Sequence, residues 1–523
     1  MSLLNTNVSM GVRESLPAYV RYEQRLSNKG ICKSRYTAKS FPTGATEFSS
    51  AGIKTMNFRI NSQDFLDATT LTLNFNAGCA VRWGGVAANE GANSFNDNIA
   101  SIIKKVTVMC AGETLEEIDN FNMLSNMLTY ASVPKQYYDH QLSVAEGAYG
   151  LIPKSKAGFV VNGTPLQSNI NWPLVYSQGS NDLAIQRFMT HQRYSLSLSL
   201  LGISRTSNYL PIRGMPLTLQ IELEDYKTCC VHYPTGNGAG AVANTDPPAA
   251  NQNYVVNDVY LTYDCVVLDG TYTTLIDKLM ASNRGLALHF NTWSNQNRTF
   301  QASQNSLLIS KGVSHLKSVM FGITKLSDLT NTGVQSLSTF LPLDFANGST
   351  TGDYQGKDSS IQLTIGSRNY GLDAFSTPSV IYTELNKMLH QHANIEAGGC
   401  INWENWNGFK NYNNSGVPVA GSGYWGVGYD SGVASGPAFG AWGEPEVHYD
   451  QAVKNLTVMG FNLEAVMNSE ALVGIDTRSQ GGFNIMLKLN WGANAPADPM
   501  RLTCFVHYDK AVVLRNNTVQ VSE

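Results

Sequence analysis

The segment Phe121-Asn-Met-Leu-Ser-Asn-Met-Leu128 has a counterpart in Tyr382-Thr-Glu-Leu-Asn-Lys-Met-Leu389, and this pair indicates how the chain is organised. In each segment an aromatic residue is followed by leucines three and seven positions later. That spacing places all three side chains on one face of a helix. The segments begin 261 residues apart, at positions 121 and 382, in a chain of 523. The sequence therefore indicates two similar halves, each with a short helix.

Two further pairs of segments occur in the same order. Apolar residues alternate along Leu217–Leu223 and again along Phe483–Leu489, as expected of a strand with one buried face. The Tyr-Asp start of Tyr263–Leu268 recurs in Tyr508–Leu514 with one extra residue. The offset of this last pair is shorter by 21 residues, which is the length of the Gly/Pro/Ala/Asn-rich segment Tyr233–Asn253 of the first half. Each match is weak by itself, but three in one order indicate a tandem duplication.

The other apolar segments predict mainly strands, so the chain is expected to be all-β, with two β-sandwiches of roughly 200–250 residues each. Three helices are predicted, near Leu115–Ala131, at Thr271–Met280 as a connection, and near Pro378–His392. The predicted strands are Ile53–Asn61, Thr69–Asn76, Ile102–Cys110, Tyr194–Leu201, Pro216–Glu224, Val255–Asp269, Leu286–Asn291, Lys317–Thr324, Ile361–Ile365, Leu456–Leu463, Phe483–Asn490 and Leu502–Leu514.

These elements divide the chain into three parts. Residues 1–50 are predicted to be an N-terminal arm, residues 51–284 the first β unit with a connecting helix at about 271–282, and residues 285–523 the second. The second unit contains a long Gly- and Trp-rich loop, residues 400–445. This loop carries half of the tryptophans, and we interpret them as candidate contacts with a neighbouring molecule, although a loop packed on itself is an equal alternative. They are Trp403, Trp406, Trp425 and Trp442.

Basic residues gather in the N-terminal arm, whereas the whole chain has a net charge of −4. Between positions 11 and 40 the only acidic residues are Glu14 and Glu23, whereas seven residues are basic: Arg13, Arg21, Arg25, Lys29, Lys33, Arg35 and Lys39. Basic segments with interspersed tyrosines can follow nucleic acid or an anionic membrane. A solvated tail or one that bridges subunits is the favoured interpretation, because this cluster is modest in charge.

The cysteines and the first residues of the sequence indicate the cellular compartment in which the protein folds. None of the eight cysteines forms a CxxC pair, and Cys110, Cys265 and Cys504 lie in predicted strands. We therefore expect reduced thiols and assembly in a reducing compartment. The first residues lack the apolar run of a signal peptide, and no stretch approaches the roughly 18 apolar residues of a membrane span. The protein is expected not to be secreted.

Two motifs could bind a ligand but lack the required context. Gly421-Ser-Gly-Tyr-Trp-Gly426 matches GxGxxG, yet more glycines follow, so the helix of a dinucleotide site cannot begin there. Cys229-Cys-Val-His232 could ligate a metal, but vicinal cysteines of a strand point to opposite faces, and no second ligand pair has matching spacing. We expect no cofactor and no metal.

Acidic pairs are the remaining candidates for catalysis. Glu116-Glu117 and the pair Glu222 and Glu224 are of the kind that glycoside hydrolases use. Because Glu222 and Glu224 fall on the polar face of a predicted strand, we interpret them as solvated carboxylates. The sequence also lacks HExxH and GxSxG motifs. We therefore expect no catalytic residue and no enzymatic activity.

One region resembles a known family. The segments His191–Leu200, Asn208-Tyr-Leu-Pro211 and Met215–Leu223 form a strand, a leucine-proline turn and a strongly alternating strand. This order is similar to that of double jelly-roll major capsid proteins, which include those of virophages, polinton-like viruses and large nucleocytoplasmic DNA viruses. The duplication, the helix in each half and the Tyr-Asp strand agree with it over most of residues 50–515. The Trp/Phe-rich run of the large-virus proteins is missing, which favours the smaller relatives.

The resemblance implies two tandem eight-stranded antiparallel jelly rolls with short helices in their loops. It also implies a structural protein of the virion, a homotrimer that forms a pseudo-hexagonal capsomer and tiles an icosahedral shell assembled inside the host cell. Its partners would be itself, neighbouring capsomers, penton proteins and minor or cement proteins, with the arm on the inside near genome or membrane. No small-molecule substrate is implied. Deleting residues 1–40 would then leave a folded trimer but impair shell assembly.

A two-domain jelly-roll carbohydrate-binding protein or glycoside hydrolase is the alternative of another class, because jelly rolls also host those functions. The Trp-rich loop is its best support, since aromatic side chains can form sugar platforms. The missing secretion signal speaks against it. A monomer that binds sugar would favour this alternative over a trimer.

Overall fold

The structure is a computed structural model of the chain. It describes residues 32–79, 91–95, 98–134, 143–146, 192–206, 208–234, 252–282, 285–301, 303–304, 306–330, 337, 340–341, 359–375, 378–391, 399–401, 456–464, 474–478, 484–491, 498–515 and 518–522.

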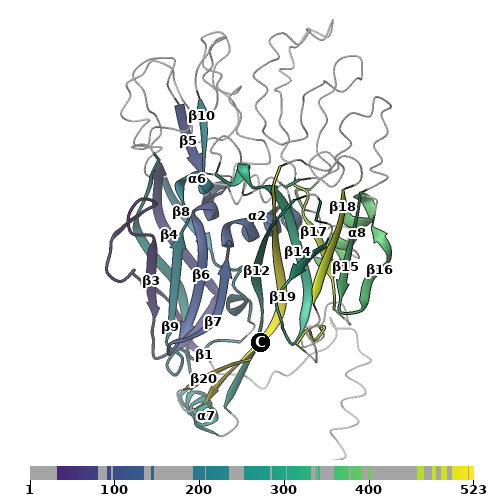
Figure 1. Cartoon of the computed structure of the whole chain (residues 1–523). Helices are drawn as coiled ribbons and strands as arrows, with labels where there is room; N and C mark the ends of the chain where they lie inside the picture. The colour runs from purple at the N-terminus through teal and green to yellow at the C-terminus, as the bar shows by residue number, and fades with distance from the viewer. Residues whose placement is uncertain are drawn as a thin grey trace, which may run out of the picture.

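The first half consists of two antiparallel sheets that face each other (Figure 1). One sheet has the order β1 (Cys32–Ser40), β11 (Tyr254–Leu268), β4 (Phe65–Cys79) and β8 (Gln192–Ser197), with β2 (Glu47–Ser49) also paired to β11. The other has the order β3 (Thr55–Ile60), β9 (Leu217–Leu223), β6 (Ile103–Cys110) and β7 (Glu113–Asp119). A separate ribbon pairs β5 (Gly91–Phe95) with β10 (Cys230–Pro234).

The second half repeats this arrangement. Its first sheet has the order β12 (Leu286–Phe300), β19 (Met500–Arg515), β14 (Leu316–Lys325) and β17 (Met459–Asn462), with β20 (Thr518–Ser522) also paired to β19. Its second sheet has the order β13 (Ser306–Ile309), β18 (Ile485–Trp491), β15 (Ser359–Ile365) and β16 (Arg368–Phe375).

The strand order along the chain is the same in both halves. In each, the first strand pairs with a long strand near the end of the half, β1 with β11 and β12 with β19, and the two sheets exchange strands as they do in a jelly roll. Helix α2 (Phe121–Ser132) follows β7, and α8 (Pro378–Met388) follows β16. Strands β9 and β18 are equivalent, as are β11 and β19. All three segment pairs found in the sequence thus occupy equivalent positions, and the prediction of two eight-stranded jelly rolls is confirmed.

Short helices lie in the connections, as predicted. Helix α7 (Gly270–Ala281) joins the halves, and its first turn is capped by Asp269, whose Oδ2 accepts from Thr271 N at 3.0 Å. Figure 1 shows α7 at one end of the molecule, with β20, and the β5–β10 ribbon at the other. The remaining helices are η2 (Ile99–Ile102), α4 (Ser143–Glu146), η5 (Gly202–Arg205), α6 (Tyr226–Cys229) and η7 (Ser327–Thr330).

One sequence prediction needs correction, and strand pairing extends into the segment predicted as an arm. The helix predicted from Leu115 begins only at Phe121, because β7 occupies Glu113–Asp119 and pairs with β6. Asn120, with a φ of 50°, turns the chain between strand and helix. The predicted arm also contains β1 and β2, both paired with β11, so the chain from Cys32 onward belongs to the first sheet. The sequence shows no strand pattern at β1, because the side chains of β1 are mostly exposed and polar.

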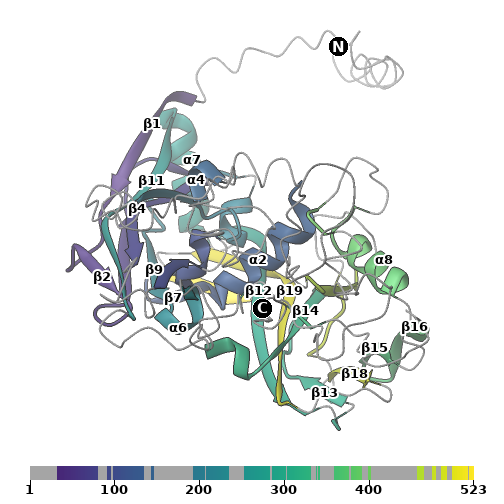
Figure 2. The same ribbon diagram turned by 90° about the horizontal axis from the view of Figure 1, so that it is seen from above.

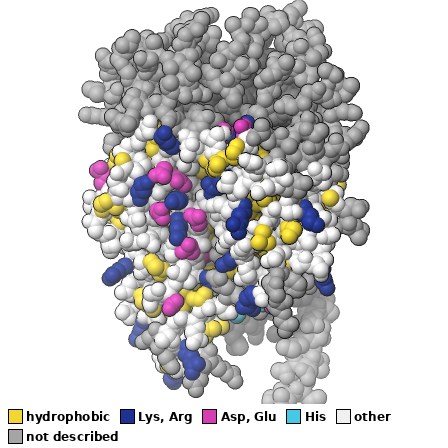
Figure 3. Space-filling view, in the orientation of Figure 1, with side chains coloured by type: hydrophobic (Ala, Val, Ile, Leu, Met, Phe, Trp, Pro, Cys, Tyr) yellow, Lys and Arg dark blue, Asp and Glu magenta, His cyan; other side chains and the backbone are white. Residues whose placement is uncertain are grey.

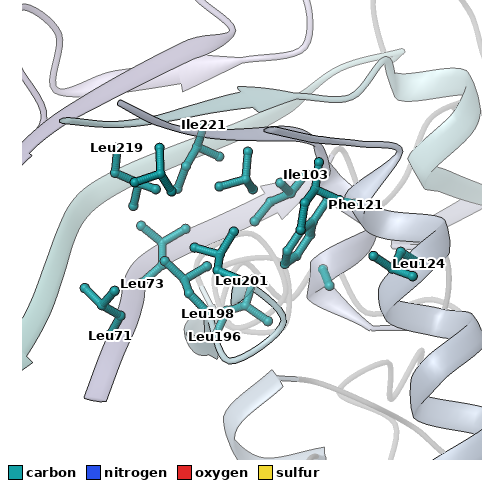
Figure 4. Close-up of a cluster of buried hydrophobic side chains, with 14 of the residues drawn as sticks. Leu71, Leu73, Ile103, Phe121, Leu124, Leu196, Leu198, Leu201, Leu219 and Ile221 are labelled. Carbon is teal, nitrogen blue, oxygen red and sulfur yellow. The ribbon is translucent and has the colours of Figure 1, made fainter. Parts of the chain in front are cut away.

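One hydrophobic cluster crosses from the first half into the second, and a separate cluster fills the space between the sheets of the second half. In the first half, leucines of β4 and β8 meet β9 and the apolar face of α2 between the sheets, where Phe121 and Leu124 close the space (Figure 4). The same cluster continues to Leu288 and Phe290 of β12 and to Phe505 of β19. Seen from above, α2 lies between the halves and α8 on the outer side of the second (Figure 2). The two halves therefore pack as one block.

Candidate functional site: the junction of the halves and the outer surfaces

Glu116 is a fully buried carboxylate at the junction. Its Oε1 accepts hydrogen bonds from Gly202 N and from Thr292 Oγ1 of β12, both at 2.7 Å, and its Oε2 accepts from Ile203 N at 3.2 Å. Burial raises the pKa of Glu116, and the three donors oppose this shift. The carboxylate therefore ties a strand and a turn of the first half to the second half.

A bulge in β7 explains why Glu116 points inward. Val108 of β6 is opposite Glu116, and Met109 is opposite Thr114, so Leu115 is the extra residue. Leu115 and Glu116 are consecutive and both buried, which a regular strand does not allow, whereas Glu117 is exposed. The prediction offered Glu116 and Glu117 as one acidic pair, but the structure gives them opposite surroundings.

Other polar and backbone contacts join the halves around Glu116. Asn120 Nδ2 donates to Asn295 Oδ1 at 3.0 Å, and Arg501 donates to Asn120 Oδ1 at 3.2 Å. Gly202 packs directly on the β12 backbone, because a Cβ there would lie 1.7 Å from the Asn291 carbonyl oxygen. These contacts fix how the two jelly rolls sit against each other.

Three of the seven basic residues of the predicted arm lie in the described part of the chain, and each contacts a residue of the same chain. Lys33 Nζ is 3.0 Å from Asp269 Oδ1. Arg35 is 2.7 Å from Asp67 and 2.8 Å from Asp264. Lys39 Nζ lies 4.8 Å from the centre of the Tyr260 ring. These three cations therefore hold β1 on its neighbours. The other four, Arg13, Arg21, Arg25 and Lys29, lie outside the described residues.

The four loop tryptophans, Trp403, Trp406, Trp425 and Trp442, also lie outside the described residues, as does the GxGxxG motif at residues 421–426. Their predicted roles stay predictions. Within the described ranges, no group of three or more His, Cys, Asp or Glu side chains could hold a metal ion.

Two other sequence candidates have structural surroundings. Cys229 ends α6 and Cys230 begins β10, so they do not share a strand; both are buried, with their Sγ atoms 3.7 Å apart. Glu222 pairs with Lys104 at 3.3 Å on the surface. Glu224 is buried, and Asn122 Nδ2 donates to its Oε2 at 3.1 Å. The interpretation of Glu224 as solvated was therefore wrong, because this residue lies just beyond the end of β9, where the alternation stops.

The outer surface carries intermixed charges and scattered apolar side chains. Figure 3 shows acidic and basic groups side by side on one face of the first half. Pairs such as Lys105 and Glu117, 2.9 Å apart, belong to the sheet of β6, β7 and β9. The apolar side chains of α7 that stay exposed are Tyr272, Leu275 and Leu279. Among the helices of the described ranges, none is long and apolar enough to span a membrane.

Comparison with known proteins finds likeness in structure and not in sequence. No protein-family model and no curated protein matches the chain. A chain of the cryo-EM structure of the Sputnik virophage aligns with a TM-score of 0.53 and 12% identity, covering 97% of this chain and 93% of that chain. The Faustovirus major capsid protein aligns with a TM-score of 0.51 and 7% identity, covering 96% and 94%.

These likenesses extend over nearly the whole chain, so they include both jelly rolls and their connection. At identities of 7–12% they show a shared fold. The resemblance to double jelly-roll capsid proteins is thereby confirmed for the fold. The narrower prediction of a virophage or polinton-like relative stays a prediction, since the two alignments have similar scores.

Proposed function

We propose that this chain is a major capsid protein, a structural and non-catalytic component of a virion. The observation that carries the proposal is a pair of jelly rolls with one strand order, joined by a continuous core into one block. The Faustovirus major capsid protein shares this fold along the length of the chain. A shell needs rigid blocks with large flanks, and the junction around Glu116 supplies rigidity between the two units.

The block suits a trimer. Two jelly rolls side by side give each chain two similar lobes, and three chains around a threefold axis present six (Figure 2). Such a capsomer has a pseudo-hexagonal outline and can tile an icosahedral face. Within each roll the strands pair into sheets whose flanks neighbouring copies can cover. We propose that homotrimers of this kind assemble inside the host cell and contact neighbouring capsomers, penton proteins and minor proteins.

The strand pairing supports a proposed domain division. We propose a first unit that begins with β1 and ends with β11, the connecting helix α7, and a second unit from β12 to β20. The arm is then limited to residues before Cys32, and Arg13, Arg21, Arg25 and Lys29 are its proposed contacts with neighbouring capsomers, genome or membrane. The loop of residues 400–445, with its four tryptophans, is proposed to contact a neighbouring subunit.

Light scattering coupled to size-exclusion chromatography tests the proposal. A trimer has a mass of about 171 kDa, three times the 57.0 kDa of the chain. Negative-stain images of the purified trimer should show a six-lobed outline, and at high concentration the protein should form sheets or shells. A stable monomer that binds oligosaccharides in a glycan array would contradict the capsid role.

Two truncations separate the arm from the first sheet. Removal of residues 1–31 is expected to leave the trimer folded and to impair shell assembly. Removal of residues 1–40 also deletes β1 and its pairing with β11, so this variant should lose stability as well. The earlier expectation for residues 1–40 is thus revised. Normal particles from the shorter truncation would show that the arm has no bridging role.

A further inference from the structure

Three charged side chains are buried together inside the second half. Lys317 lies on β14, Asp509 on β19, and Glu464 two residues after β17. Lys317 Nζ is 3.4 Å from Asp509 Oδ1 and 3.4 Å from Glu464 Oε1. The three side chains are only 4–5% exposed. Because β14 pairs with both β17 and β19, the lysine lies between its two carboxylates in the middle of the sheet.

A bulge directs Lys317 to this position. Leu316 is opposite Tyr508 and Ser318 is opposite His507, so Lys317 is the extra residue in the ladder between β14 and β19. A bulged residue leaves the regular pairing, and its side chain is re-aimed. Backbone contacts on both sides hold the carboxylates in place: Leu463 N donates to the Lys317 carbonyl at 2.8 Å, and Asp509 N donates to the His315 carbonyl at 3.2 Å.

The surroundings disfavour charges. The sequence neighbours Val319, Leu463 and Val506 are buried hydrophobic residues. Glu464 Oε2 makes no hydrogen bond with any residue in the described part of the chain, and His390 Nε2 lies 3.5 Å from it. Condensation within such a triad begins with transfer of the ammonium proton to a carboxylate. The products are a neutral amine, which is a nucleophile, and a carboxylic acid beside it.

We propose that Lys317 and Asp509 condense to form an intramolecular isopeptide bond, with Glu464 as the catalytic acid and base. The lone pair of Nζ attacks Asp509 Cγ and forms the new C–N bond. Glu464 takes the proton that the nitrogen loses and donates a proton to the departing hydroxyl group. The C–O bond breaks, and one water molecule leaves. The amide contains the remaining atoms, so the reaction needs no oxidant and no cofactor.

Proximity supplies the main part of the rate. The fold holds Nζ 3.4 Å from a carboxylate oxygen of Asp509 and 3.4 Å from one of Glu464, so the reacting carboxyl group and the proton carrier lie beside the same atom. The released water is diluted into the solvent, which favours the linked product. The bond joins two strands that already lie side by side, so it requires no rearrangement of the sheet.

A second lysine–aspartate pair on the same strand provides the matched control. Lys325 Nζ, at the end of β14, is 3.0 Å from Asp498 Oδ2, which is closer than the proposed pair. The side chain of Asp498 is 55% exposed, in contrast to the buried carboxylates beside Lys317. Water solvates the Asp498 carboxylate, so this pair should not condense. The inference is independent of the proposed capsid role.

Mass spectrometry of the denatured full-length chain tests the proposal directly. The expected mass is lower than that of the sequence by one water molecule. Trypsin should release a branched peptide in which residues 312–325 are joined to residues 502–510, with no cleavage after Lys317. Folded protein that has the full mass and separate peptides would overturn the proposal, and so would a link through any other pair of residues.

Three variants test the roles of the residues. Glu464→Gln keeps the side-chain shape and should yield folded, unlinked chains of full mass. Asp509→Asn should still link but release ammonia in place of water, so its linked product should have the same mass as the linked wild-type chain. Lys325→Arg, the control, should link as the wild-type chain does. Circular dichroism verifies that each variant is folded. A Glu464→Gln variant that links as completely as the wild-type chain would overturn the catalytic assignment of Glu464.

Discussion

At the scale of single residues, Glu116 and Glu117 offer a matched comparison. Replacement of Glu116 by Gln puts an amide N–H group opposite a backbone N–H donor, so we expect a loss of about 1–3 kcal/mol in the free energy of unfolding at neutral pH. Glu117→Gln removes only a surface ion pair with Lys105 and should change stability by less than about 0.5 kcal/mol. Urea denaturation of both variants measures the difference, and equal losses would contradict the role of Glu116.

The wild-type protein and the Glu116→Gln variant also test how stability depends on pH. Because burial raises the pKa of Glu116, the folded state binds this proton at a higher pH than the unfolded state does. The free energy of unfolding of the wild-type protein, relative to that of Glu116→Gln, should therefore increase as the pH falls into the range where Glu116 of the folded protein binds its proton. A stability difference that is constant with pH would show that Glu116 titrates alike in both states.

His507 has the opposite pH behaviour. It stacks on Trp293 with ring centres 4.3 Å apart, and burial lowers the pKa of His507 to about 3. Between about pH 6.5 and 3 the unfolded chain binds a proton that the folded chain does not, so this residue decreases stability by about 1.4 kcal/mol per pH unit as the pH falls. His507→Phe keeps a stacked ring and should lose this slope in denaturant titrations from pH 7 to 4. An unchanged slope would contradict the prediction.

These residues were not predictable from the sequence. Glu116 and Glu117 are chemically identical neighbours, and only the bulge at Leu115 decides which one turns inward. The burial of Lys317 also depends on a bulge, and it requires strands that lie far apart in the chain. Bulges and long-range contacts leave no periodic signal, because each adds one residue to a pattern that otherwise alternates.

At the scale of elements, the turn of η5 against β12 sets the distance between the halves. Gly202→Ala should decrease stability by about 3 kcal/mol or more, because the new Cβ would overlap the carbonyl group of Asn291 and backbone atoms cannot move aside cheaply. Gly270→Ala, at the start of α7, meets no atom within 4 Å and should change stability by no more than about 1 kcal/mol. Melting temperatures of the two variants test this, and similar values would contradict it.

Elements with a regular pattern were predictable, and those without one were not. The alternation of Leu217–Leu223 identified β9, and the shared spacing of Phe121 and Tyr382 located α2 and α8. The sequence predicts helix where β7 lies, because the bulge of β7 disturbs the alternation next to a true helical pattern. The sequence does not reveal β1, because this strand has few buried apolar side chains. Ion pairs and hydrogen bonds attach it to the sheet, as those of Arg35 and Thr37 with Asp264 show.

At the scale of the whole molecule, the shared core predicts that the two halves unfold together. Phe290 and Phe505 of the second half pack in the same cluster as Leu73 and Phe121 of the first. Calorimetry should show one transition whose calorimetric and van't Hoff enthalpies agree. Two separate transitions would show that the jelly rolls are independent, and they would weaken the view of the chain as one rigid block.

The pairing of each half's first strand with its last has a consequence for synthesis on the ribosome. Strand β1 can pair only after β11, more than two hundred residues later, has been synthesised, and β12 can pair only after β19 has been synthesised. During translation, β1 has exposed backbone donors and acceptors that another nascent chain can pair with. Its two lysines and one arginine repel the same strand of a second chain, and the aspartate partners at positions 264 and 269 are synthesised only with β11 and the residue after it. Charge thus selects the intended neighbour before the apolar core exists.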